Sequence, residues 1–406
     1  MLIVIEAPGK LKSLNKALQK LGVDAETVAT VGHIKGFSQD GLWPIGVNKD
    51  FVPTGLRSLK PEVVENLIEA MTRHKFIVIA TDPDSEGHYI ANDVLALCHP
   101  EANVSRANFY GFDPEHIKQG LDEAHPIDTS LADPASRRIV LDRVLSSVLS
   151  SEDNQAYAGR VITPTIEKVS STEQSTLEIV PGVPFDGVEL VYHASAMLNK
   201  SPKEVAKHLQ DIYENGKMSY HRSDSHRITP ETVRQIGKAY GVGLTIRENI
   251  DDGVHPAPFP IQNGKPVDLG LPLDVLTTED AIISIAGRQM AGGFHEDGDY
   301  GSNLCHHAIE AMVSMGVGRP STIPFISTKL EKNGTLDHDR KLTSRGHAWL
   351  EAGAPLIGQK AQDTLNEYIN NGGDIRECLD ELGIADKVSQ QLDHSEVEED
   401  MGFNHS

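Results

Sequence analysis

The apolar and polar positions of the first 125 residues alternate between two patterns. Short apolar runs at 2–5 and 76–80 predict buried strands, and each run ends in acidic residues. Leucines at helical spacing predict a helix over 11–21, and a second helix is expected to pass through 89–95. A third short strand is predicted near 107–110, before a helix that Asp113 caps and Pro114 opens. Repeated strand–helix units favour a mainly parallel sheet with helices on both faces.

The remainder of the chain has mostly helical periodicity. Helices are predicted within 133–171, over 201–214, from Thr229, within 278–350 and over 374–382, whereas 177–194 has the pattern of extended β structure broken by a Pro-Gly pair. The residues from Ser389 onward hold five acidic residues and no Lys or Arg, which predicts a solvated tail.

Composition narrows the classes of protein that fit. A chain of 406 residues suggests two to four domains, and no apolar run reaches the roughly 18 residues that a membrane span needs. The three cysteines, Cys98, Cys305 and Cys378, are too few and too scattered for a disulfide scaffold or a four-cysteine zinc site, so a reducing cytoplasm is expected. The net charge of −22 argues against nonspecific affinity for nucleic acid but leaves room for a local basic groove.

An acidic cluster follows the second apolar run. Asp82, Asp84 and Glu86 lie within five residues, and Glu6 ends the neighbouring predicted strand. Carboxylates this close repel one another unless a cation neutralises them, and Mg²⁺ prefers such hard oxygen ligands. The plainer interpretation is a solvated loop with acids at a helix start.

Three further patterns suggest phosphate chemistry, although each has a plainer interpretation when taken alone. Tyr220 with Arg222 two positions on could attack a phosphate, with Asp224 orienting the arginine, or Tyr220 could be a surface residue in a polar strand. His255 in a proline-rich segment could donate a proton or be an ordinary loop histidine. Arg319 at a helix start could hold a DNA phosphate or only begin the helix.

Together these segments resemble the type IA DNA topoisomerase family, and the matches run in family order over roughly residues 2–345. MLIVIEAPGK is similar to the first strand of its Toprim domain, TVGHI at 30–34 to its next block, and ATDPDSEG at 80–87 to its metal-binding signature. Arg138 with Asp142-Arg143, and then Gly159-Arg160-Val161, look like its basic helices. SYHRSDS at 219–225 is similar to the nucleophile motif, and Gly316–Thr322 to a late Gly-x-Gly-Arg-Pro-Ser-Thr block.

The resemblance implies a role for each matched residue. Tyr220 is expected to attack a phosphodiester of single-stranded DNA, with Arg222, Lys10 and His255 assisting and Glu6 as general acid. Mg²⁺ is expected on Asp82, Asp84 and Glu86. The residues expected to bind DNA are His33, Arg138, Asp142, Arg143, Arg160, Asp224, Ser225 and Arg319. No ATP is needed, in agreement with the lack of a phosphate-binding GxxxxGK[ST] motif.

The implied fold is multidomain: a Rossmann-like parallel Toprim sheet, then mainly helical winged-helix-like domains and a short β gate. The expected boundaries are 1–125 for the Toprim domain, 126–172 and 274–388 for the helical DNA-binding domain, 173–200 and about 263–273 for the gate, 201–262 for the nucleophile domain and 389–406 for an acidic disordered tail. A monomer that acts on single-stranded or underwound DNA, without a membrane, is expected.

Departures from the family pattern keep other functions open. Ser85 stands where the family usually has Arg, His88 where it usually has Glu, and Ile162-Thr163 where it usually has Gln-Ser. The span from Arg160 to Tyr220 is short for the family's gate, and the zinc-ribbon cysteines of many bacterial members are missing. The alternatives are a nicking or strand-transfer enzyme without efficient strand passage, a catalytically impaired DNA-binding relic, and a Toprim primase or nuclease, which would leave Tyr220 and Arg222 unexplained.

Overall fold

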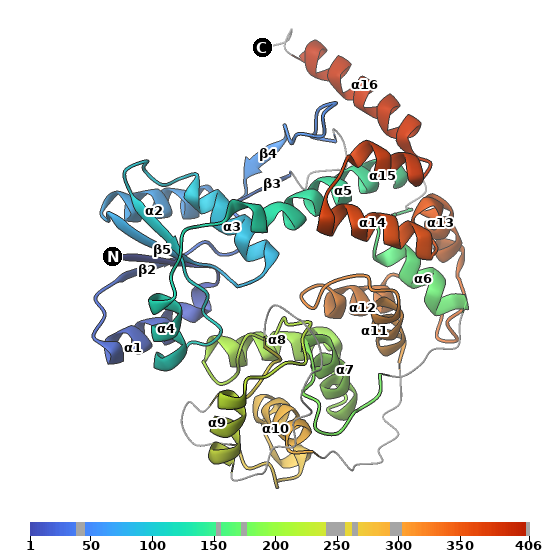
Figure 1. The fold of residues 1–406 in the computed structure, drawn as a ribbon. Helices are drawn as coiled ribbons and strands as arrows, with labels where there is room; N and C mark the ends of the chain where they lie inside the picture. The colour runs from blue at the N-terminus through green and yellow to red at the C-terminus, as the bar shows by residue number, and fades with distance from the viewer. Residues whose placement is uncertain are drawn as a thin grey trace.

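The computed structural model describes residues 1–37, 45–151, 156–171, 177–240, 256–261, 267–292 and 303–402. Its N-terminal part is built on a parallel four-stranded sheet with the order β2–β1–β5–β6 (Figure 1). The strands are β1 (Leu2–Ile5), β2 (Glu26–Ala29), β5 (Phe76–Ala80) and β6 (Asn103–Arg106). Ile5 pairs with Ala80, so Glu6 and the acidic segment from Asp82 leave the sheet at the same edge.

Side-chain alternation along these strands explains why helices cover both faces of the sheet. Leu2 and Val4 point to the face covered by α2 (Pro61–Thr72) and α3 (Ser85–Leu95). Ile3 and Ile5 point to the opposite face, which α1 (Leu11–Leu21) and α4 (Pro114–Asp122) cover. All four side chains are fully buried, as is expected for a strand with helices on both sides. A small antiparallel pair, β3 (Lys35–Phe37) and β4 (Leu56–Ser58), lies beside this unit.

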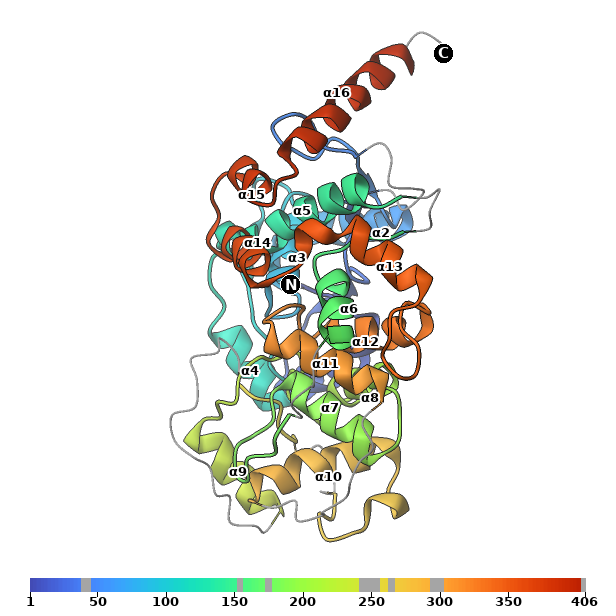
Figure 2. The same cartoon turned by 90° about the vertical axis from the view of Figure 1, so that its right-hand side faces the viewer.

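The rest of the described chain is helical and forms three main packing groups (Figures 1 and 2). The first joins α5 (Asp133–Leu149), α14 (Gln359–Asn371), α15 (Ile375–Glu381) and α16 (Ala385–Gly402). The second joins α6 (Ile162–Ser171), α11 (Leu304–Ser314), α12 (Ile323–Lys332) and α13 (Ser344–Ala352). The third joins α7 (Gly187–Met197), α8 (Pro202–Glu214) and α10 (Thr278–Met290), and α9 (Pro230–Tyr240) packs near α10 through Met290.

Short 3₁₀ turns complete the list of elements. They are η1 (Pro8–Lys10), η2 (Thr129–Ala132), η3 (Leu273–Val275) and η4 (Ala354–Leu356). No helix in the described part of the chain is both long enough and apolar enough to cross a bilayer.

The predicted β structure over 177–194 is wrong, because the described residues there form an extended segment followed by helix α7. Asp186 starts this helix by accepting hydrogen bonds from the backbone N–H groups of Val188 and Glu189, at 2.8 and 2.7 Å, and Glu189 completes a capping box. Its apolar residues are buried around most of the helix circumference. Such a continuous apolar run does not separate a buried strand from a buried helix. In the predicted returning gate stretch, residues 267–273 hold turns and the start of η3, and 263–266 lie outside the described residues.

Two smaller expectations also differ from the structure. The third strand lies at Asn103–Arg106 rather than 107–110, whereas the helices predicted within 133–171 are confirmed as α5 and α6. The expected disordered tail is helical as far as Gly402, because Val388 and Leu392 are buried in the same apolar cluster as α5. Figure 2 shows α16 extending away from the other helices. The Asp113-capped helix and those at 201–214 and 374–382 are confirmed as α4, α8 and α15.

Candidate active site at the edge of the sheet

The edge of the sheet at the end of β1 and β5 holds a buried ion pair. Turn η1 follows β1 at once and carries Lys10, whose Nζ bonds to Asp82 after β5. Both side chains are almost fully buried, at 1% and 4% exposure. The ammonium also lies 4.6 Å from the centre of the Tyr213 ring, which adds a cation–π contact. The pair therefore holds one positive charge beside the acidic cluster.

Arg106 fixes the backbone that carries the cluster. This arginine is 1% exposed, and its guanidinium donates to the carbonyl oxygens of Ile79, Thr81 and Asp82 at 2.9–3.0 Å. Burial lowers its pKa to about 10, so it stays protonated at neutral pH. Arg106 thus clamps the strand end from which Asp82 projects.

Tyr220 is buried against this edge with 1% of its surface exposed. Its hydroxyl donates to Asp84, and its backbone N–H donates to the carbonyl of Tyr110 at 2.9 Å. Asp84 also caps α3 by accepting the N–H of Gly87 at 2.8 Å, so its position is fixed by the helix. Burial and the charges of Asp84 and Asp82 raise the pKa of Tyr220 well above its usual value. In this arrangement the hydroxyl keeps its proton.

Arg222 lies on the same side as Asp82 but has a different orienting partner from the one expected. Its Nη2 donates to Gln210 on α8 at 3.0 Å, and its Nη1 lies 3.9 Å from Asp82. Burial opposes its charged form, but Asp82 and the neighbouring anions raise the pKa of Arg222 above its ordinary value. Asp224 is exposed on the wall of a cavity and is not the partner that holds Arg222.

Glu6 carries a perturbed carboxyl. Burial, followed by the charges of Asp82 and Asp84, raises its pKa from 4.5 to about 7, although Lys10 and Arg222 act in the opposite direction. A carboxyl with such a pKa holds a proton on a substantial fraction of molecules at neutral pH, so Glu6 can supply one.

Glu86 is engaged by three cationic side chains. Its Oε1 accepts from Arg319 and from Arg138, at 2.8 Å to Nη2, and its Oε2 lies 3.1 Å from His33 Nε2. Burial acts to raise its pKa, but the hydrogen bond to His33 and the charges of Arg138 and Arg319 prevail and lower the pKa to about 2. This carboxylate therefore ties α3 to α5 and to the start of α12.

The predicted magnesium ligands do not fit a metal site as they are arranged here. They are hard oxygen donors, but Asp82 pairs with Lys10, Asp84 with Tyr220, and Glu86 with three cations. Among the residues that the structure describes, the one group of three ligating side chains that converges lies elsewhere, at Asp186, Glu189 and His226. Those contacts are accounted for by the cap of α7 and by an ion pair to His226 at 2.8 Å.

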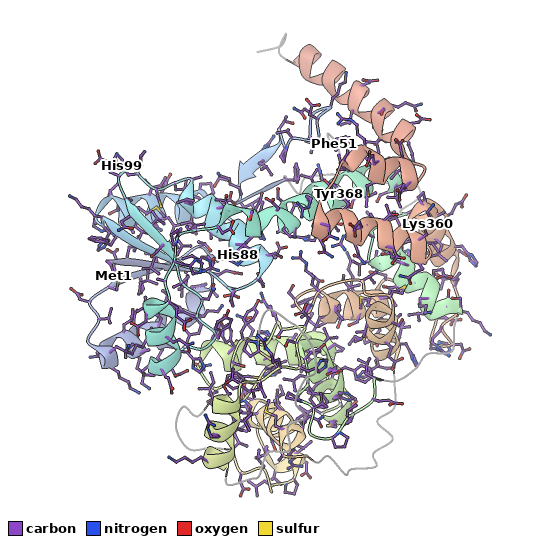
Figure 3. All side chains as sticks on the ribbon, in the orientation of Figure 1. Met1, Phe51, His88, His99, Lys360 and Tyr368 are labelled. Carbon is purple, nitrogen blue, oxygen red and sulfur yellow. The ribbon has the colours of Figure 1, made fainter. Side chains whose placement is uncertain are left out.

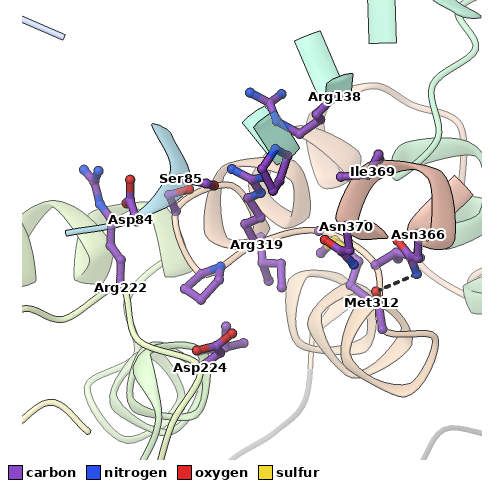
Figure 4. Close-up of a pocket in the computed structure, with 18 of the residues that line it drawn as sticks. Asp84, Ser85, Arg138, Arg222, Asp224, Met312, Arg319, Asn366, Ile369 and Asn370 are labelled. Carbon is purple, nitrogen blue, oxygen red and sulfur yellow. Dashed lines mark hydrogen bonds between the residues drawn. The ribbon is translucent and has the colours of Figure 1, made fainter. Parts of the chain in front are cut away.

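A cavity of about 640 Å³, the main cavity, opens beside residues 219–225, which we call the nucleophile segment after the family motif that they resemble (Figure 4). Its cationic lining comes from α5, the segment before α6, the nucleophile segment and the turn before α12. In Figure 4, Arg319 lies in the middle with Arg138 on one side and Asp224 on the other. The predicted site residues that line the cavity are Asp84, Glu86, Arg138, Arg160, Arg222, Asp224 and Arg319.

The other predicted DNA-binding residues have different places. Asp142 bridges Arg138, at 3.2 Å, and Arg160, at 2.7 Å. Arg143 does not line the main cavity, because it donates to the carbonyl of Ile45 at 2.9 Å and lies over the Phe37 ring. Ser225 is fully buried and accepts the N–H of Arg227. His255 lies outside the described residues.

Four residues depart from the family pattern: Ser85 and His88 are on α3, and Ile162 and Thr163 begin α6. Ser85 is the first residue of α3 and lines the main cavity. His88, labelled in Figure 3, is one turn further along the same helix. Gln210, Arg106 and Tyr213 were missed by the sequence reasoning. Arg106 ends β6 beside the acidic segment, but Gln210 and Tyr213 occur on an ordinary amphipathic helix and carry no signal of their contacts.

Two family models match parts of this chain. A family model described as the Toprim domain matches residues 1–110, and one described as DNA topoisomerase matches residues 146–245, which include Tyr220. The chain is 24% identical over 317 residues to DNA topoisomerase 1 of Aquifex aeolicus, covering 59% of this chain and 56% of that protein. It is 24% identical over 249 residues to the "DNA topoisomerase 1 type prokaryotic" of Acanthamoeba polyphaga mimivirus, covering 61% and 27%.

The fold also matches a solved structure. Full-length topoisomerase I from Thermotoga maritima superposes with a TM-score of 0.69 at 16% identity, covering 97% of this chain and 90% of that one. This chain spans about half of the length, or less, of the curated relatives that it matches.

The chain thus carries a Toprim domain followed by a tyrosine-bearing segment that matches DNA topoisomerases. In these two regions and in its fold it is similar to the type IA DNA topoisomerases.

Proposed function

We propose that the chain is an ATP-independent topoisomerase that cleaves one DNA strand through a 5′-phosphotyrosine, passes a strand and religates, thereby relaxing negative supercoils. The observation that carries the proposal is the position of the Tyr220 hydroxyl. It donates a hydrogen bond to Asp84, at the edge of the Toprim sheet, and Arg222 lies nearby. An isolated surface tyrosine would have no such surroundings.

The proposed reaction exchanges one phosphoester for another. The Tyr220 oxygen attacks the phosphorus, the bond from phosphorus to the 3′ oxygen breaks, and the 5′-phosphate stays on the tyrosine. Asp84 accepts the hydrogen bond of the hydroxyl and is placed to receive its proton. Glu6, with a pKa of about 7, is the group that protonates the departing 3′ oxygen. Religation is the reverse, so the energy of the broken bond is conserved and ATP is not required.

In the proposed reaction, positively charged side chains stabilise the negative charge of the scissile phosphate. Arg222, held by Gln210, is placed to bind the non-bridging oxygens, and Lys10 offsets the carboxylates behind it. The assisting role of His255 stays a prediction. The match to the Toprim domain implies Mg²⁺ as a cofactor, but the three predicted ligands are engaged with other groups in this arrangement, so no step of the proposed reaction is assigned to the metal.

The proposed substrate is single-stranded or underwound DNA in the main cavity. Arg138, Arg160 and Arg319 lie on its walls in a protein whose net charge is −22, so phosphate binding is concentrated there. Binding that depends on a few local cations is expected to weaken steeply with salt.

A nicking enzyme without efficient strand passage is the second candidate. One observation favours it: the residues expected to form gate strands instead supply α7, which is buried against α8 and α10. A gate that lacks this stretch has less chain with which to enclose a DNA strand.

Two assays on the same preparations separate the candidates. A labelled single-stranded oligonucleotide reports denaturant-resistant covalent adducts, and negatively supercoiled plasmid with Mg²⁺ and without ATP reports relaxation. The wild type is expected to do both, Tyr220→Phe neither, and the exposed control Tyr157→Phe both. Adduct formation without relaxation would support the nicking enzyme, and an adduct in Tyr220→Phe would show that the nucleophile is another residue.

A further inference from the structure

A second cavity lies next to the main one, on the other side of Arg222. It measures about 290 Å³, near the lower end of the roughly 300–1,000 Å³ of ligand pockets. The two cavities share Arg222, Pro320 and Ser321 in their linings, so they are adjacent. We call it the lysine pocket because Lys203 and Lys207 of α8 line it.

The charge of the lysine pocket favours an anion. Lys203 and Lys207 are one helical turn apart and exposed, and neither has a carboxylate partner among the described residues. Arg222 adds a third positive charge. The one acidic residue in the lining, Glu204, is held in the capping box of α8 by Ser201, with 2.6 Å between the hydroxyl and the carboxylate. The walls therefore carry a surplus of positive charge.

An aromatic ring lies beside these cations. Phe325 of α12 is 46% exposed although it is a large apolar residue, and Lys203 Nζ lies 5.9 Å from its ring centre. Exposed aromatic faces beside basic residues are the elements with which proteins bind single-stranded nucleic acid, because every base can stack on a ring. The pocket thus pairs a stacking surface with phosphate-binding charge.

A buried histidine is also part of the lining. His221 is 6% exposed, and its Nδ1 is buried without a hydrogen-bond partner among the described residues. Burial, with the charges of Arg222 and Lys10, lowers the pKa of His221 well below its usual value, so the ring is neutral. An unpaired buried nitrogen carries a cost, which a small movement of the ring towards a polar base edge in the pocket would relieve.

The origin of the walls indicates which part of a strand would enter. Every lining residue comes from α7, α8, the nucleophile segment, the turn before α12 or α12 itself, and the Toprim carboxylates line only the main cavity. The pocket therefore belongs to the side of the molecule that carries Tyr220. In the proposed reaction that side keeps the 5′-phosphate end of the cleaved strand.

We propose that the lysine pocket binds one nucleotide of the DNA strand downstream of the scissile phosphate, with its base on Phe325 and beside His221 and its phosphate between the lysines and Arg222. This inference rests on the proposed function for the direction of the strand. It gives the cleaved end a second hold besides the covalent bond, so that the end stays in place for religation.

The test is an abasic scan. Single-stranded oligonucleotides with one abasic position each are bound to full-length Tyr220→Phe protein and to the same protein with Phe325→Ala or Lys207→Ala, and affinity is read by fluorescence anisotropy. Phe325 and Lys207 are exposed, so their loss should leave the fold intact. Phe76→Ala and Lys332→Ala are the matched controls, because both side chains are exposed and lie outside the lining.

One downstream abasic position should weaken binding to the Tyr220→Phe protein, and Phe325→Ala should weaken binding of intact DNA by about five- to hundredfold. Binding to the Phe325→Ala variant should no longer respond to that abasic position, and Lys207→Ala should reduce the salt dependence of binding. Normal affinity in both variants, or a sensitive position upstream of the break, would overturn the assignment. Competition by free deoxynucleotide, with no abasic-sensitive position, would overturn it in favour of an effector site.

The cleavage assay with intact Tyr220 separates this proposal from the proposed function. Covalent adducts with no effect of the pocket variants would refute the pocket alone. A pocket-dependent abasic effect in a protein that forms no adduct would refute the cleavage reaction and leave the nucleotide site standing.

Discussion

Replacing Glu86 by Gln should tighten DNA binding, although the substitution removes a predicted metal ligand. The carboxylate holds Arg138, Arg319 and His33, the same cations that are expected to meet DNA phosphate. A phosphate that enters the main cavity must draw the two arginines away from Glu86. Glutamine has nearly the same shape but no charge, so it competes far less for the guanidinium groups. Asp142 still bonds to Arg138 at 3.2 Å and keeps it in position.

The size of the effect follows from the perturbed pKa. The Glu86 side chain is 21% exposed, and its pKa falls from 4.5 to about 2. At 1.36 kcal/mol per unit, the folded state favours the ionised form by about 3 kcal/mol. Because the folded pKa is the lower one, this stability is present above pH 4.5 and is lost as the pH falls towards 2. Glu86→Gln should therefore lower the free energy of unfolding at pH 7 by up to about 3 kcal/mol.

In Glu86→Gln this energy no longer opposes the binding of phosphate by Arg138 and Arg319. The variant should therefore bind a single-stranded oligonucleotide about ten- to hundredfold more tightly than wild type. Anisotropy titrations in EDTA at fixed salt measure this without a contribution from metal, and urea unfolding measures the stability. Glu62→Gln is the matched control, since it removes the same charge from an exposed site in the first turn of α2. Equal or weaker DNA binding by Glu86→Gln would refute the idea that this carboxylate competes with phosphate.

Three further outcomes are expected. Because the pKa of Glu6 is raised in the folded state, the free energy of unfolding of the wild type should fall by up to about 3 kcal/mol as the pH rises from 4.5 to about 7. Glu6→Gln should lose much less over the same pH range, as measured by urea titrations with EDTA. Parallel pH curves for the two proteins would contradict the pKa shift. Val31 is exposed at a φ of 60°, so Val31→Gly should raise the free energy of unfolding by about 1 kcal/mol, unlike the exposed control Val52→Gly. Gly187→Ala would place Cβ 2.1 Å from the carbonyl oxygen of His221, so it should displace the nucleophile segment and reduce covalent trapping, whereas the exposed Gly270→Ala should trap normally.

The sequence predicts the Toprim part well, because its strands are short apolar runs whose ends carry the chemistry. Glu6 and Asp82 lie at one sheet edge as the parallel register requires. Proximity of Tyr220 to that edge does not follow from local pattern, since 136 residues separate it from Asp84. Only the family resemblance predicted that Tyr220 lies close to this sheet edge.

Where the sequence reasoning failed, long-range packing decided the structure. The apolar run before residue 197 is compatible with strand or helix, and the capping box at Asp186 together with burial on several sides selects the helix. Glu86 was expected to face a metal because its neighbours in the chain are acidic. Its partners come from α5 and the turn before α12, more than fifty residues away, and no local pattern predicts them.

The hydrogen bond from the Tyr220 backbone N–H to the Tyr110 carbonyl has an evolutionary consequence. Both groups belong to the main chain, so almost every amino-acid replacement at either position leaves donor and acceptor in place. Proline at 220 is the one replacement that removes the donor, and it would also remove the tyrosine. No single replacement at residue 110 or 220 therefore removes the donor or the acceptor of this bond while Tyr220 is kept. The attachment and the proposed nucleophile are inherited together.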